Sequence, residues 1–232
     1  MSGAQQRDLW TAVDEYAFSH SHPTSRPNTK ALQHAAEASK EAGLPNIAAS
    51  SSQAKFLAIT IRALGVTHAL EIGTLGASTA IWLASENPQL HVTSIEYDPG
   101  NAEVARKNVE FAGLSDRVEI IVGAGIDVIR ELKQEVLDGK RPRFGFFFID
   151  ADKENNWNYF DVAADIATKR GLIVVDNVVR QGRVADASNT DARIIGSRQV
   201  IENAGKDARV DSVVLQTVGD KGHDGWLWAV VN

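Results

Sequence analysis

The sequence predicts an α/β fold with a mainly parallel sheet of seven strands, a C-terminal antiparallel hairpin and helices on both faces. Two observations carry this prediction. Short apolar runs and amphipathic segments alternate from residue 67 to residue 175, which is typical of parallel strands joined by right-handed helical crossovers. The tail differs, because 209–217 and 226–231 are β-like runs joined by the turn-rich sequence VGDKGHDG. We therefore expect the hairpin to complete the sheet.

The N-terminal part of the chain is predicted to be helical. Apolar residues recur at helical spacing within 4–18, and 29–42 is an alanine-rich helical pattern stopped by glycine and proline. Serines at 50–52 can cap a third helix. Because the first two helices precede the alternating pattern, residues 1–45 are expected to form an N-terminal extension, either a lid or a subunit contact. Residues 46–232 would form the main domain.

Each strand predicted in the parallel part is a short apolar run bounded by turn residues, as expected for strands buried on both faces. These strands are expected at 67–72, 90–96, 117–122, 144–149 and 171–175. Each helix predicted between them combines apolar and polar positions at helical spacing. These helices are expected at 77–86, 99–113, 124–138 and 155–169.

Composition narrows the classes of protein. The chain has 232 residues, a formal charge of -6 and no basic block, so nucleic acid is not an expected partner. The absence of cysteine excludes disulfides and thiol chemistry. No apolar run approaches the roughly 20 residues that span a bilayer, and the N-terminus has no leader-like pattern. We expect a cytoplasmic protein that binds no membrane.

Polar side chains gather where two neighbouring strands are predicted to end. Asp150, Asp152 and Lys153 follow one apolar run, and Asp176 and Asn177 follow the next. In open α/β sheets this edge is where ligands bind. The oxygen donors among these residues suit a hard cation such as Mg2+. Alternatively, the acids only cap the helices and turns that follow.

A second set of residues lies at the ends of the first three predicted strands. Gly73 and Gly76 allow a sharp turn before a helix N-terminus, which favours anionic groups. The dinucleotide fingerprint G-x-G-x-x-G is absent, so a pyrophosphate is not the expected ligand. Glu96 ends the second strand and could accept both hydroxyls of a ribose, or it could cap a helix. Gly125 lies in a turn where an adenine could lie against the backbone.

The stretches EIGTLGAST, SIEYD, IDADKENNWNY and VVDNV, in this order and spacing, resemble the cation-dependent O-methyltransferases. This family includes the catechol and caffeoyl-coenzyme A O-methyltransferases. The resemblance runs from about residue 47 to the C-terminus. It implies a Rossmann-like class I methyltransferase fold that binds S-adenosylmethionine and Mg2+.

The resemblance also implies roles for individual residues. The residues implied to bind S-adenosylmethionine are Ala49, Glu71, Gly73, Thr74, Thr79, Glu96, Gly125, Asp150, Asp152 and Tyr159. Those implied to ligate the metal are Asp150, Asp176 and Asn177. Lys153 would be the general base, with Asp150 beside the methyl donor, and Lys153, Asn177 and Gln181 would contact the substrate. The polar stretch 180–191 would be a mobile lid over the substrate.

The activity implied by this resemblance is methyl transfer to one hydroxyl of a catechol or of a flavonoid vicinal diol, by an enzyme that forms a homodimer. A coenzyme A thioester of the caffeoyl type is an alternative acceptor. A nicotinamide-dependent oxidoreductase and a non-catalytic protein that binds S-adenosylmethionine are further alternatives. Trp157, Trp226 and Trp228 could stack on a flat phenol or could be core residues.

Overall fold

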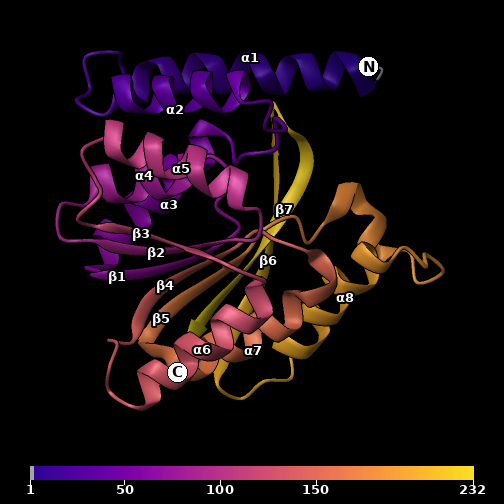
Figure 1. Cartoon of the computed structure of the whole chain (residues 1–232). Helices are drawn as coiled ribbons and strands as arrows, with labels where there is room; N and C mark the ends of the chain where they lie inside the picture. The colour runs from indigo at the N-terminus through magenta and orange to yellow at the C-terminus, as the bar shows by residue number, and fades with distance from the viewer. Residues whose placement is uncertain (1–2) are drawn as a thin grey trace.

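The computed structural model describes residues 3–232, which form a single seven-stranded sheet in the order β3-β2-β1-β4-β5-β7-β6 (Figure 1). Strands β1 to β5 are parallel, and β7 runs antiparallel to both β5 and β6. The predicted fold class, with its C-terminal antiparallel hairpin, is confirmed. The strands are β1 His68–Ile72, β2 His91–Glu96, β3 Val118–Val122, β4 Phe144–Ile149, β5 Ala167–Val175, β6 Val210–Gly219 and β7 Gly222–Val231.

Helices cover both faces of the sheet. They are α1 Gly3–Ser21, α2 Thr29–Glu41, α3 Ser51–Leu64, α4 Ser78–Glu86, α5 Pro99–Phe111, α6 Gly125–Leu137, α7 Asn156–Ile166 and α8 Ala192–Ala204, with short 3-10 turns η1 Lys153–Asn155 and η2 Arg180–Ala185. Figure 1 shows α3, α4 and α5 on one face and α6, α7 and α8 on the other. No helix within residues 3–232 is long and apolar enough to cross a membrane.

The core consists of two apolar layers separated by the sheet. Because side chains of a strand point alternately to opposite faces, Phe147 and Ile149 of β4 join the layer under α6 and α7, whereas Phe146 and Phe148 join the layer under α3 and α4. All four side chains are almost fully buried. This burial on both faces explains why β4 reads as a continuous apolar run.

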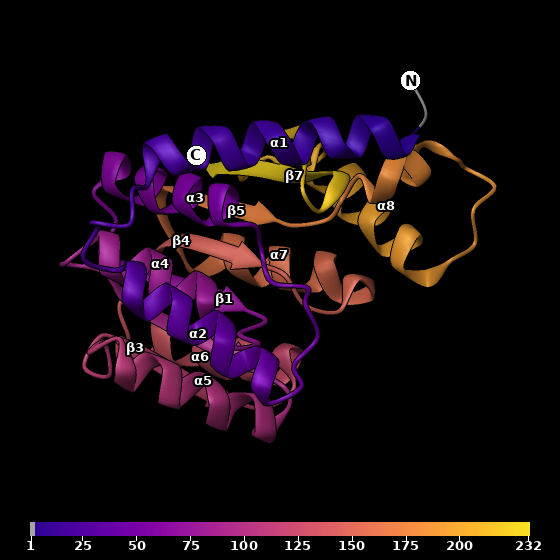
Figure 2. The same cartoon turned by 90° about the horizontal axis from the view of Figure 1, so that it is seen from above.

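The two N-terminal helices pack on the same chain in different ways. Helix α2 contacts α4 and α5, and its Ala35 belongs to the apolar core. Helix α1 contacts β6 and α3 and contains no buried residue. Figure 2 shows α1 on the outside of the molecule, next to α3. The C-terminal end of α1 is anchored by His22, whose ring lies 4.6 Å from that of Trp82 and whose Nδ1 lies 3.2 Å from Lys55 Nζ. The role of residues 1–45 as a lid or subunit contact stays a prediction.

Three local features differ from the predicted elements. The helix expected at 155–169 ends at Ile166, and β5 begins at once with Ala167. The hairpin turn is confined to residues 220–221, so the Asp224–Gly225 pair, a turn signal by sequence, lies inside β7. Helix α8 was not predicted, although Asp191 caps its first turn by accepting from the Arg193 backbone N–H at 2.9 Å.

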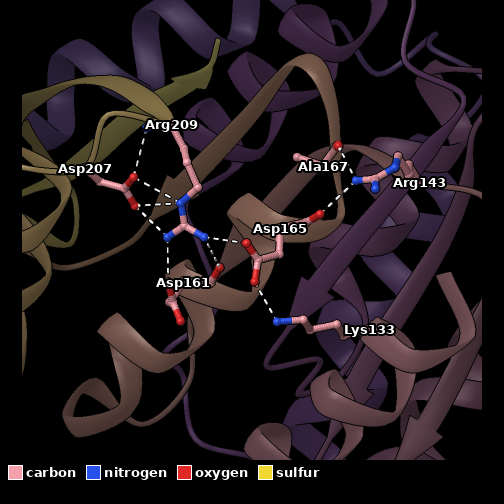
Figure 3. A network of polar contacts seen from close by, with 7 residues as sticks. All are labelled: Lys133, Arg143, Asp161, Asp165, Ala167, Asp207 and Arg209. Carbon is pink, nitrogen blue, oxygen red and sulfur yellow. Dashed lines mark hydrogen bonds and ion pairs between the residues drawn. The ribbon is translucent and has the colours of Figure 1, made fainter. Parts of the chain in front are cut away.

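An ion-pair network holds the end of α7 in place (Figure 3). The guanidinium of Arg209 lies 2.6 Å from Asp161, 2.5 Å from Asp165 and 2.6 Å from Asp207. Asp165 also pairs with Lys133 of α6 at 2.6 Å. Arg209, immediately before β6, thus pairs with two acids of α7 and with Asp207 in the turn after α8. Asp165 extends the network to α6 through Lys133.

Replacing Arg209 by methionine is expected to destabilise the fold by about 1–3 kcal/mol, because three carboxylates lose a shared, partly buried partner. Urea unfolding of parent and variant measures this difference. The control is Lys107→Met, whose pair with Glu103 is exposed on both sides, so its loss is expected to change the free energy of unfolding very little. Equal losses in the two variants would show that the network around Arg209 adds no stability of its own.

Candidate active site

A cavity of about 850 Å³ opens at the carboxyl ends of β1, β2 and β4. Because these strands are parallel neighbours in the sheet, the turns that follow them meet at one edge. The cavity brings together all the residues predicted to bind the cofactor except Glu71. They are Ala49, Gly73, Thr74, Thr79, Glu96, Gly125, Asp150, Asp152 and Tyr159.

The turn between β1 and α4 is shaped by close backbone contacts. Gly73 has φ +102°, and a Cβ there would lie 2.2 Å from the Asp150 carbonyl oxygen, so only glycine lets the ends of β1 and β4 approach so closely. Glu96 organises the same turn, because it accepts the backbone N–H of Leu75 at 2.7 Å and that of Asp98 at 2.9 Å. Each of its oxygens retains a lone pair for a further donor in the cavity.

Glu71 lies beneath this turn rather than in the cavity lining. Its carboxylate is fully buried and accepts a hydrogen bond from Ser94 Oγ at 2.5 Å, and Ser94 in turn lies 2.6 Å from Thr74 Oγ1. Burial raises the pKa of Glu71 to about 8. Glu71 therefore supports Thr74 from behind, and its contact with the cofactor, expected through water, stays a prediction.

The far end of the cavity is formed by the turn after β3 and the start of α7. The hydroxyl of Tyr159 donates to Asp152 at 2.5 Å, and burial raises the pKa of Tyr159 well above its usual range. A Cβ on Gly125 would lie 2.8 Å from the same hydroxyl. These three residues, each predicted at the cofactor site, are therefore in direct contact or closely packed.

A second cavity, of about 900 Å³, lies between α1, α3 and the β6–β7 hairpin. The predicted metal ligands lie between the two cavities: Asp150 lines the first, Asp176 the second, and Asn177 both. A cation held by all three side chains would lie where the cavities meet. Within residues 3–232 no three His, Cys, Asp or Glu side chains cluster as a metal site.

The electrostatics of Asp176 fit a cation. The side chain is almost fully buried, and burial together with the negative charge of Asp150 raises the pKa of Asp176 to about 7. Its Oδ1 accepts hydrogen bonds from Trp226 Nε1 at 2.7 Å and from the Asn177 backbone N–H at 2.8 Å. No hydrogen bond engages Oδ2 among the described residues, which leaves that oxygen free for a ligand.

Comparison with known proteins decides the class. A family model described as O-methyltransferase matches residues 22–222. The chain belongs to the O-methyltransferase family. It is 50% identical to the O-methyltransferase imqG of Aspergillus flavus, over 96% of this chain and 91% of that protein. It is 43% identical to a catechol O-methyltransferase of Mycobacterium tuberculosis, over 87% of this chain and 88% of that protein.

Solved structures agree with this assignment. An O-methyltransferase of Bacillus cereus in complex with SAH matches with a TM-score of 0.90 and 38% identity, over 97% of this chain and 100% of that one. The predicted resemblance and enzyme class are confirmed: the chain is an S-adenosylmethionine-dependent O-methyltransferase. The alternative of a nicotinamide-dependent oxidoreductase is wrong.

In this O-methyltransferase Lys153 is held from two sides. Its Nζ lies 2.6 Å from Asp150 Oδ1, and its side chain is only 9% exposed. On the other side α8 packs against its backbone, since a Cβ on Gly196 would lie 2.1 Å from the Lys153 carbonyl oxygen. Gly196 thus positions Lys153. Neither Gly196 nor α8 was predicted from the sequence, although the capping Asp191 and the helix-forming residues after it were a signal.

The loop after β5 places a different residue at the site from the one predicted. Gln181 is exposed and is absent from the lining of both cavities, whereas Arg180 lines both. The loop predicted to be a mobile lid is hydrogen-bonded to the body of the enzyme, because Arg198 donates to the carbonyls of Val184 at 3.3 Å and Asp186 at 2.6 Å. The lid role stays a prediction.

The tryptophans differ in position. Trp226 lines the second cavity and stacks on Phe56, with ring centroids 5.8 Å apart. Trp228 packs against Phe56 at 5.5 Å, and Trp157 stacks on Phe160 at 5.7 Å, but neither tryptophan lines the first or the second cavity. Trp226 is therefore the one of the three placed to contact an acceptor in the second cavity.

Proposed function

We propose that this enzyme transfers a methyl group from S-adenosylmethionine to one hydroxyl of a vicinal aromatic diol, a catechol or a flavonoid, with Mg2+ bound. The observation that carries the proposal is the position of Asp150, Asp176 and Asn177 between two cavities, with Lys153 paired to Asp150. The first cavity would hold the cofactor and the second the acceptor. The name of the mycobacterial relative, a catechol O-methyltransferase, supports the acceptor class.

Cofactor and ion supply chemistry that the side chains lack. When bound, S-adenosylmethionine would supply the methyl group, and Mg2+ would favour the ionised form of an acceptor hydroxyl. Asp150, Asp176 and Asn177 would hold the ion through oxygen atoms, as Mg2+ prefers. Glu96 would hold the ribose of the cofactor.

The protein side chains would orient the acceptor and move the proton. Lys153, as a neutral amine, can take the proton of the attacking hydroxyl, and Asp150 fixes the position of its Nζ at 2.6 Å. Phe56 and Trp226 give the second cavity an apolar wall for the aromatic ring. Fixed orientation of the two reacting groups would lower the barrier by several kcal/mol, about 7–11 kcal/mol in the best cases.

A matched pair of phenols tests the function. The expected result is that a catechol acid such as caffeate is methylated with kcat/KM at least about tenfold above that of the corresponding monohydroxy phenol, because two hydroxyls fix the attack geometry and one does not. EDTA should abolish turnover and Mg2+ should restore it. Equal rates for diol and monophenol, or full activity in EDTA, would contradict the proposal.

A coenzyme A thioester is the second candidate acceptor. The observation in its favour is that Arg7, Arg180 and Lys221 line the second cavity and could contact phosphate groups. Turnover of caffeoyl-coenzyme A with no turnover of caffeate would assign the enzyme to this class. The metal-ligand proposal would then stand and the free-diol acceptor would not.

We also propose a homodimer. The edge strand β6 exposes Val213, Leu215 and Val218, and α1 beside it exposes Leu9 and Val13. Exposed apolar side chains on neighbouring elements are typical of a surface that a partner covers. Light scattering at micromolar concentration is expected to give the mass of two chains, and the mass of one chain would contradict the proposal. The cytoplasmic location stays a prediction.

A further inference from the structure

The guanidinium of Arg180 has no carboxylate partner among the residues that the structure describes. Its Nε is buried and has no hydrogen-bond partner, and no ion pair or side-chain hydrogen bond of its guanidinium exists within residues 3–232. The residue is half-buried and lines both cavities. A guanidinium carries five N–H donors and cannot lose its charge, so removing it from water without a partner is unfavourable. An anionic ligand would remove this cost.

The neighbouring cations of the first cavity do not share this property. Lys153 pairs with Asp150 at 2.6 Å, and Arg193 pairs with Asp191 at 2.9 Å. Both of these side chains therefore have an internal carboxylate as their partner. Of the three cationic side chains that line the first cavity, only that of Arg180 has no carboxylate partner within residues 3–232. Its guanidinium is therefore free to bind a ligand group.

The backbone that carries Arg180 is strained and firmly held. Arg180 and Gln181 have φ values of +54° and +59°, which non-glycine residues rarely adopt. Asp224 of β7 compensates, because its Oδ1 accepts the backbone N–H groups of Val179 at 3.1 Å, Arg180 at 2.9 Å and Gly225 at 3.0 Å. Strain of this kind persists where the surroundings fix it, and it gathers at ligand-binding positions.

We propose that Arg180 binds an anionic group of the acceptor, so that the preferred substrates are vicinal aromatic diols carrying a carboxylate. This inference rests on the proposed function. The acceptor rather than the cofactor is assigned because Arg180 follows Asn177 in the loop after β5, and because it also lines the second cavity, where Ala49 is the only predicted cofactor residue. A phosphate of a coenzyme A thioester would offer the same anionic chemistry.

The test compares caffeate, its neutral methyl ester and caffeoyl-coenzyme A with the parent enzyme and three variants. Arg180→Met removes the positive charge. Arg180→Lys keeps the charge but lacks the planar guanidinium with its paired N–H donors. Arg183→Met removes an exposed arginine of the same loop that lines neither cavity. Binding of S-adenosylhomocysteine is measured by calorimetry for each protein.

The parent is expected to favour caffeate over the methyl ester by about tenfold or more in kcat/KM, mainly through KM, since charge-assisted hydrogen bonds are the stronger ones. Arg180→Met should lower kcat/KM for caffeate until the two acceptors are equal, with the ester unaffected. Arg180→Lys should restore part of the preference, and Arg183→Met should keep all of it. If the parent prefers only the thioester, and Arg180→Met loses this preference, then Arg180 binds a phosphate of coenzyme A. The proposal that it binds an acceptor carboxylate would then be wrong.

Other outcomes overturn the inference in distinguishable ways. If the parent methylates acid and ester equally, Arg180 does not select for charge, although the proposed function stands. If Arg180→Met weakens S-adenosylhomocysteine binding about tenfold, the loss expected for caffeate kcat/KM, the guanidinium binds the carboxylate of the cofactor instead. If the parent methylates no diol at all, the proposed function itself fails.

Discussion

Replacement of Asp176 by asparagine is expected to lower Mg2+-dependent methyl transfer about 100-fold or more, while the fold remains intact. Asparagine keeps an oxygen that accepts the Trp226 Nε1–H, at 2.7 Å in the parent, but loses the negative charge. Loss of an outer-shell partner of a metal site already costs 10–100-fold in affinity or activity. Loss of a charged ligand should cost at least as much.

The Asp176→Asn variant separates metal binding from folding. Because the pKa of Asp176 is raised from 3.8 to about 7, the ionised carboxylate without a cation destabilises the fold progressively as pH rises from about 4 to 7. At pH 8 without Mg2+ the variant should therefore melt at or above the parent temperature. Mg2+ should raise the melting temperature of the parent and not that of the variant.

Two further proteins complete this experiment. Asp186→Asn removes an exposed acid of the neighbouring loop and should behave like the parent in both assays. Asp176→Ala should melt lower than Asp176→Asn, because it leaves the buried Trp226 N–H without an acceptor, at a cost of about 1–3 kcal/mol. Full activity of Asp176→Asn in EDTA would show that the carboxylate holds no essential ion.

That Asp150 and Asp176 lie at one edge of the sheet could be predicted, because sheet topology does most of the positioning. Asp150 and Asp176 are separated along the sequence, yet each follows a strand, and β4 and β5 are parallel neighbours in register from Phe146–Leu172 to Ile149–Val175. Two adjacent parallel strands end at the same edge of a sheet, so the residues that follow them lie close together. Predicting the two strands therefore predicts that these residues are neighbours. The sequence pattern contained this information.

The direction of individual side chains could not be predicted in the same way. Glu71 lies in a strand buried on both faces, so no alternation of polar and apolar residues indicated whether its carboxylate points to the cavity or beneath the turn. Arg180 rather than Gln181 enters the cavities because the backbone turns through left-handed conformations at both residues. That turn depends on Asp224, a contact between distant parts of the chain.

Replacement of Lys153 by methionine is expected to lower kcat by about 100- to 10,000-fold, the range for loss of a general base. The methionine side chain is of similar length and apolar, so it can occupy the buried site, although Asp150 loses its partner at 2.6 Å. Lys153 lines the first cavity, so binding of S-adenosylhomocysteine is measured as well, and unchanged binding with a lower kcat would assign the loss to the chemical step. Stopped-flow or single-turnover assays with labelled methyl donor would separate the chemical step from product release.

Lysine could act in a second way, as a fixed positive charge, and Lys153→Arg distinguishes the two roles. Arginine keeps the charge and can pair with Asp150, but its guanidinium does not lose a proton in proteins. If Lys153 is the base, arginine should be as poor as methionine. If the arginine variant recovers most of the parental kcat, the positive charge is what matters, and the proton of the acceptor hydroxyl leaves by another route.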